Sequence, residues 1–145
     1  MINIFCYFLF VHHILTIKKW PHYNKLIELI LNRYGDEYKI VTAPGPSEIN
    51  DAKDINALAL LDNGRALDIS QLTSLIKGSS FVVANDTGPA HIAAHVGAKG
   101  LTLFGKHTTA YLVSIERDNF KAIQVNDLIN LSAEKVFERL TNSLS

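Results

Sequence analysis

The stretch FVVANDTGPAHIAAH (residues 81–95) decides the fold of this chain of 145 residues. Its apolar first part is typical of a buried strand that ends abruptly at Asp-Thr-Gly (86–88). A helix follows at once, with Pro89 expected as its first residue and Gly97 as its stop. Residues 100–104, GLTLF, predict the next strand. This order of strand, tight turn, helix and strand places a helix N-terminus at the carboxyl edge of a parallel sheet.

The start of that helix is a candidate binding site for a negatively charged group. The N–H groups of Gly88, Ala90 and His91 are expected to be free there, and the helix dipole adds about +0.5 charge. Pro89 has no N–H and leaves a gap in this set of donors. The pattern therefore indicates a site for a diphosphate.

Strand-like and helical segments alternate along the rest of the chain. The expected strands are residues 4–11, 39–43, 66–69, 81–85, 100–104 and 121–125. The expected helices are residues 23–34, a segment from about residue 47 to residues 57–60, residues 71–77 capped by Ser70, residues 89–96, and a last helix opened by Ser132. Asn63-Gly64 predicts a turn. This alternation predicts an α/β fold, a Rossmann-like open parallel sheet with helices on both faces. We expect residues 1–145 to form a single domain.

Composition excludes several classes of protein. The formal net charge is +0 and 48% of the residues are hydrophobic, which argues against both disorder and nucleic-acid binding. Cys6 is the only cysteine, so no internal disulfide can form, and a reducing compartment is compatible with the sequence. The apolar residues 2–15 are too few for a membrane helix and lack the features of a signal peptide.

Residues 81–105 resemble the signature of glycosyltransferase family 9, the heptosyltransferases of lipopolysaccharide assembly. That signature is a hydrophobic strand, Asp-Thr-Gly-Pro-x-His, a helix of small residues, a glycine, and a strand that ends in Phe-Gly. Residues 18–21, Lys-Lys-Trp-Pro, resemble the family's basic-Trp-Pro element, and residues 68–76 lie where the family has a Leu-rich helix. The resemblance covers roughly residues 16–140.

The resemblance implies the C-terminal, donor-binding half of a two-domain GT-B glycosyltransferase. Such an enzyme transfers a heptose or another sugar from an ADP-sugar to a lipid-linked lipopolysaccharide core. We therefore expect a cytoplasmic protein, peripheral at the inner face of the inner membrane, with no cofactor besides its nucleotide-sugar substrate. The family's acceptor domain, with its proposed catalytic carboxylate, precedes this domain and is expected to be absent. The catalytic residue is then unknown, and a separate acceptor-domain chain is a possible partner.

The resemblance also suggests which residues contact the donor. Lys18 matches the family's phosphate-binding lysine. Thr87 and Gly88 are expected to contact phosphate through hydroxyl and backbone, and His91 to donate to phosphate or sugar.

Two acidic residues are candidates for the sugar and the ribose. Asp86 suits sugar hydroxyls or a phosphate-binding lysine better than phosphate itself, and the alternative is a turn-shaping aspartate. Glu48 lies where the family carries an acid on the nucleotide ribose, although acids are also common at helix starts. His95 follows His91 at helical spacing, but no third ligand is apparent, so we expect no metal site and a packing role for His95.

Two loops depart from the family pattern, and other functions stay open. Residues 10–17 contain no glycine or serine, and residues 106–109 are Lys-His-Thr-Thr in place of a Pro-Thr-Asp-like loop. The chain could be a non-catalytic nucleotide-binding module or a remnant that binds little. Asp-Thr-Gly also occurs in aspartic proteases, which would require an all-β fold. A nucleotide-sugar epimerase shares the expected architecture but carries acidic residues after the signature glycine, and these are not seen here.

Overall fold

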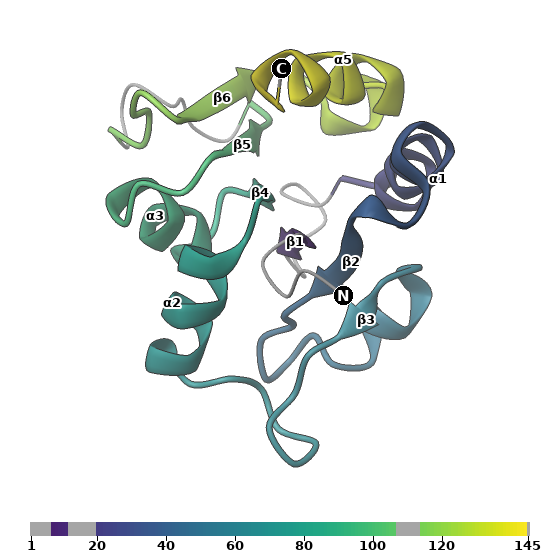
Figure 1. The fold of residues 1–145 in the computed structure, drawn as a ribbon. Coiled ribbons are helices and arrows are strands. Elements are labelled where there is room, and N and C mark those ends of the chain that lie inside the picture. The colour runs from purple at the N-terminus through teal and green to yellow at the C-terminus, as the bar shows by residue number, and fades with distance from the viewer. Residues whose placement is uncertain (1–6, 12–19, 107–113, 145) are drawn as a thin grey trace.

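A parallel sheet forms the centre of the molecule (Figure 1). The computed structural model describes residues 7–11, 20–106 and 114–144. The sheet has six strands in the order β3-β2-β1-β4-β5-β6, and each neighbouring pair is parallel. The strands are β1 (Tyr7–Val11), β2 (Lys39–Thr42), β3 (Leu58–Ala59), β4 (Phe81–Asn85), β5 (Gly100–Phe104) and β6 (Phe120–Gln124). The predicted open parallel α/β sheet is confirmed, and the all-β fold of an aspartic protease is not what these residues form.

Helices cover both faces of the sheet (Figure 1). The α-helices are α1 (Tyr23–Tyr34), α2 (Ile69–Gly78), α3 (Gly88–His95) and α5 (Ala133–Leu144), and short 3-10 turns lie at Gly35–Glu37, Asp51–Asp54 and Leu128–Asn130. Helices α1 and α5 pack on one face, and α2 and α3 on the other. None of the helices in the described part of the chain is long and apolar enough to cross a membrane.

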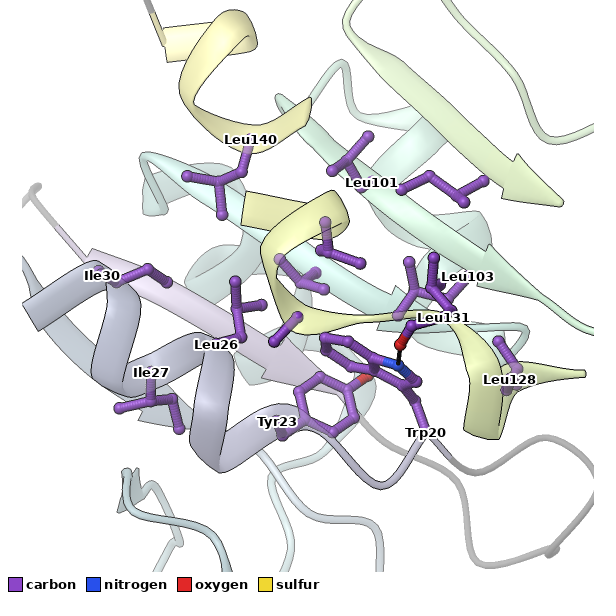
Figure 2. Close-up of a cluster of buried hydrophobic side chains, with 14 of the residues drawn as sticks. Trp20, Tyr23, Leu26, Ile27, Ile30, Leu101, Leu103, Leu128, Leu131 and Leu140 are labelled. Atoms are coloured by element: carbon purple, nitrogen blue, oxygen red, sulfur yellow. Dashed lines mark hydrogen bonds between the residues drawn. The ribbon is translucent and has the colours of Figure 1, made fainter. Parts of the chain in front are cut away.

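The core under α1 and α5 is built from large side chains (Figure 2). Trp20 and Tyr23 are packed edge to face, with ring centroids 5.0 Å apart. The indole Nε1 of Trp20 donates to the carbonyl oxygen of Leu131 at 2.8 Å, which fastens the start of α1 to the segment before α5. This bond satisfies the polar atom of a side chain that is otherwise buried among apolar groups.

The core under α2 and α3 combines large side chains such as Phe104 and Phe120 with small residues on α3, which let α3 approach the sheet closely. Ala90, Ala93 and Ala94 supply the buried face of α3. Gly100 is equally constrained, because a Cβ there would clash with the carbonyl oxygen of Val82. Close packing in this layer fixes the position of α3 against the strands that lead into it.

Several predicted element boundaries are confirmed. Helix α1 spans the predicted residues and ends at Gly35, whose φ of 57° suits glycine. Helix α3 is stopped at Gly97, whose φ is 76°. It begins one residue earlier than predicted, so that Pro89 is its second residue.

The segment between β2 and α2 was predicted wrongly. In place of a helix it forms turns, the 3-10 turn and strand β3, and the strand expected at residues 66–69 is absent. Asn24 of α1 explains the difference, because its side chain donates to the Asp54 carbonyl at 2.7 Å and accepts from the Asn56 N–H at 2.8 Å. These bonds occupy backbone groups that a helix would need for itself.

The cap of α2 also differs from the prediction. Asp68 rather than Ser70 caps the helix, since its Oδ1 accepts from the Gln71 N–H at 2.7 Å. The Gln71 side chain accepts from the Asp68 N–H at 2.9 Å, which completes a capping box. The predicted turn at Asn63-Gly64 is confirmed, with φ of 50° and 80°.

Candidate nucleotide-binding site

The site lies at the carboxyl edge of the sheet, where the strand order reverses. Strand β1 pairs with β2 on one side and with β4 on the other. In open parallel sheets, ligands bind at such a switch point. The Asp-Thr-Gly loop (residues 86–88) leaves β4 at this edge and enters α3.

Thr87 shapes the N-terminus of α3. Its backbone is extended, and its hydroxyl accepts from the Ala90 N–H at 3.4 Å. The Thr87 carbonyl also accepts from Ala90 at 3.1 Å and from His91 at 3.4 Å. The expectation that these two N–H groups are free is therefore wrong. Within the described part of the chain, the Gly88 N–H makes no hydrogen bond and remains the available backbone donor.

The polar side chains of the loop and helix differ in exposure. Asp86 is 8% exposed and His91 is half-buried in the first turn of α3. His95 is exposed and its Nδ1 lies 2.8 Å from the His91 carbonyl oxygen, so the predicted packing role is wrong. Among the residues that the structure describes, no group of three or more potential ligands is placed to hold a metal ion.

Glu48 lies in the loop after β2, at the same edge. Its N–H donates to the Gly45 carbonyl at 3.0 Å, and its carbonyl accepts from Ala52 at 3.0 Å. A Cβ on Gly45 would lie 3.2 Å from Oε1, so the carboxyl group folds back over this glycine. Partial burial, with a smaller contribution from the charge of Asp51, raises the pKa of Glu48. Lys18 lies outside the described residues.

A buried hydrogen bond that the sequence did not reveal joins two elements of the site. The Tyr23 hydroxyl donates to Asn85 Oδ1 at 2.8 Å, linking the first residue of α1 to the last residue of β4. Burial, and then the charge of Glu48, raises the pKa of Tyr23 well above its ordinary value. Through the hydrogen bond, Tyr23 is held against the residue that precedes Asp86.

Two polar atoms in the neighbouring strands β4 and β5 are buried without a hydrogen-bond partner, Asn85 Nδ2 and Thr102 Oγ1. Such groups are uncommon in folded proteins, and each one calls for a water, a ligand or a functional reason. Asn85 stands at the end of its strand, next to the Asp-Thr-Gly loop. The sequence gives no sign that this amide nitrogen lacks a partner, because an asparagine followed by an aspartate is also common in ordinary turns.

A small cavity lies beside Tyr23, at the start of α1. Its volume is about 280 Å³, and its lining includes Trp20, Tyr23, Asp51, Asp54 and Ile55. The 3-10 turn that follows Glu48 thus supplies one wall of a hollow between α1 and the carboxyl edge.

The sequence profile of glycosyltransferase family 9 (heptosyltransferase) matches residues 8–140. No curated protein matches the chain in sequence. Among solved structures, the chain is similar to E. coli heptosyltransferase WaaC with ADP, at 24% identity and a TM-score of 0.81, with 94% of this chain and 44% of that chain covered.

Two further solved structures are similar. E. coli ADP-heptose lps heptosyltransferase II shows 20% identity and a TM-score of 0.79, over 96% of this chain and 46% of that one. A Methanocaldococcus jannaschii UDP-GlcNAc 2-epimerase in complex with UDP-GlcNAc and UDP shows 15% identity and a TM-score of 0.65, over 96% and 38%. These likenesses show the fold, and the chain spans less than half the length of each protein.

Proposed function

This chain belongs to glycosyltransferase family 9, the heptosyltransferases, and from that premise we propose that it is the donor-binding half of a sugar transferase. The proposal rests above all on one observation. Residues 81–105 form a strand, loop, helix and strand that set the α3 N-terminus at the switch point of the sheet. Because Glu48 lies at the same edge, this edge offers donors for phosphate and a carboxyl group for hydroxyls.

In this proposal the donor lies along the carboxyl edge. The Gly88 N–H, the Thr87 hydroxyl and the His91 ring bind the diphosphate, together with Lys18. Asp86 accepts hydrogen bonds from the sugar, and Glu48 accepts them from the ribose. A heptose carried on ADP is the proposed donor, since the similar E. coli heptosyltransferase WaaC was solved both with ADP and with ADP-2-deoxy-2-fluoro heptose.

The proposed reaction joins the sugar to a hydroxyl of a lipopolysaccharide core at the cytoplasmic face of the inner membrane. The acceptor oxygen forms a bond to the anomeric carbon, and the bond from that carbon to the phosphate oxygen breaks. The diphosphate leaves with the electron pair, and the α3 N-terminus stabilises its charge. The acceptor's proton passes to a base in an acceptor-binding half, which a longer chain or a separate chain would supply.

Calorimetric titration of the purified chain with ADP, UDP and GDP tests the proposal. We expect ADP to bind and Glu48→Gln to weaken it, because an amide accepts fewer hydrogen bonds from ribose hydroxyls than a carboxylate does. The matched control is Glu37→Gln, an exposed residue at the opposite, amino edge of β2. A folded chain that binds none of the three nucleotides would refute the proposal.

A second assay distinguishes a transferase half from a non-catalytic nucleotide-binding module. The chain is mixed with an acceptor-binding half from a heptosyltransferase, with ADP-heptose and lipopolysaccharide core, and ADP release is followed. Release that depends on this chain supports the transferase. Tight ADP binding without release in any such mixture supports the module.

A further inference from the structure

Strands β4 and β5 bring two chain segments to the carboxyl edge side by side (Figure 1). Asn85 is the register partner of Leu103 in this parallel pair. Three residues beyond these partners the chain reaches Gly88 on one side and Lys106 on the other. Neighbouring strands lie about 4.8 Å apart, so the segments that carry Gly88 and Lys106 leave the sheet at adjoining positions on this edge.

The backbone that leads to Lys106 is held in place by β6. The Val125 N–H donates to the Phe104 carbonyl at 2.9 Å, and Gln124 Nε2 donates to the Gly105 carbonyl at 2.6 Å. Gly105 is buried, whereas Lys106 is exposed. The position of Lys106 at this edge is therefore fixed by its neighbours, while its ammonium group reaches solvent.

The charge of Lys106 is not used within the described part of the chain. No ion pair or hydrogen bond engages its side chain there. Among the described residues that occupy the first two positions after strands β2 to β6, Lys106 is the only basic one, and Asp86 is acidic. A diphosphate at this edge would lie near a buried carboxylate, so it needs a cation close by.

Asn85 ends β4 directly before the Asp-Thr-Gly loop, and its side chain turns toward Tyr23 of α1, on the face of the sheet opposite α3. Its side chain is 0% exposed, and its amide nitrogen has no acceptor.

We propose that Lys106 is a further diphosphate-binding residue, which pairs its ammonium group with the phosphate oxygens held at the α3 N-terminus. This inference rests on the proposed function, because it assigns a contact within the same donor site. Lys106 recognises the charged part of the donor, so it strengthens the binding of nucleoside diphosphates more than the binding of monophosphates or nucleosides. It also stabilises the charge that the diphosphate gains when it leaves.

The test is calorimetric titration of wild type and Lys106→Gln with ADP, AMP and adenosine. A hydrogen bond to a charged group contributes enough that its loss is expected to weaken ADP binding by about tenfold or more. Binding of adenosine is expected to stay unchanged. The ADP affinity of the wild type is also expected to fall more steeply with added salt than that of the variant. Lys106→Arg, which keeps the charge, should recover most of the affinity.

The matched control is Lys99→Gln, which removes the same charge from an exposed lysine at the amino end of β5. It is expected to bind ADP as the wild type does. The inference is overturned if Lys106→Gln binds ADP like the wild type, or if both variants weaken it equally. A wild type that binds no ADP would overturn the proposed function together with this inference, whereas the other two outcomes leave the proposed function standing.

Discussion

Replacing Tyr23 with phenylalanine tests the buried link between α1 and β4. The substitution removes a hydroxyl from a side chain that is 2% exposed and deletes its 2.8 Å bond to Asn85 Oδ1. Since Asn85 Nδ2 already lacks a partner, the variant leaves both ends of a buried amide without a hydrogen bond. A lost bond together with an unpaired buried acceptor costs about 2 kcal/mol of unfolding free energy.

Urea denaturation followed by circular dichroism measures this change. We expect Tyr23→Phe to lower the midpoint with an unchanged slope, because the surface exposed on unfolding stays the same. The double variant Tyr23→Phe, Asn85→Leu should recover much of the loss, since it replaces both partners by apolar groups. Thr102→Val is the control, because it removes a buried hydroxyl that has no partner, and it should be neutral or stabilising.

Two results would refute this reasoning. A Tyr23→Phe variant as stable as the wild type would show that the bond contributes nothing. A double variant no more stable than the single one would show that the unpaired amide is not the source of the loss.

Three other changes have defined outcomes. Asp68→Ala should lower the unfolding free energy by about 1 kcal/mol through loss of the α2 cap, whereas Ser70→Ala should leave it nearly unchanged in the same urea titration. Gly100→Ala should cost about 3 kcal/mol, because its Cβ meets the Val82 carbonyl, and a normal midpoint would contradict this packing. The raised pKa of Glu48 means that the folded state holds its proton more tightly, so stability falls as pH rises through that pKa. Glu48→Gln should therefore be more stable than the wild type at neutral pH and equal to it below the ordinary glutamate range, and equal stability at every pH would contradict the shift.

The part of the fold that the sequence predicted well is governed by short-range signals. The strand at residues 81–85, the Asp-Thr-Gly loop and the strand at residues 100–104 each carry their own boundary residues. Helix α1 is likewise bounded by Pro21 before it and Gly35 after it. Where the local signals for the end of a strand, a turn and the end of a helix agree with one another, tertiary packing does not change the structure that they predict.

The errors arise where distant residues compete with local preference. Residues 47–60 contain good helix formers. The side chain of Asn24 nevertheless binds the backbone of Asp54 and Asn56, so the chain leaves the helical path there and continues into β3. The Tyr23–Asn85 bond joins residues 62 positions apart, so no window of sequence contains both partners. At α2, Asp68 and Ser70 are both competent caps, and only the backbone path chooses between them.

The Trp20–Leu131 bond has a consequence for the order in which the chain matures during synthesis. It closes a loop of 111 residues, and the bond from His22 to the Ile129 carbonyl closes one almost as long. Closing such long loops costs chain entropy, and early in folding no contacts between residues close in sequence offset that cost. The segment that begins α1 therefore cannot be locked until residues 129–131 have left the ribosome. A nascent chain still lacking those residues is expected to show native-like β4, β5 and α3 while Trp20 remains open to solvent and to quenchers.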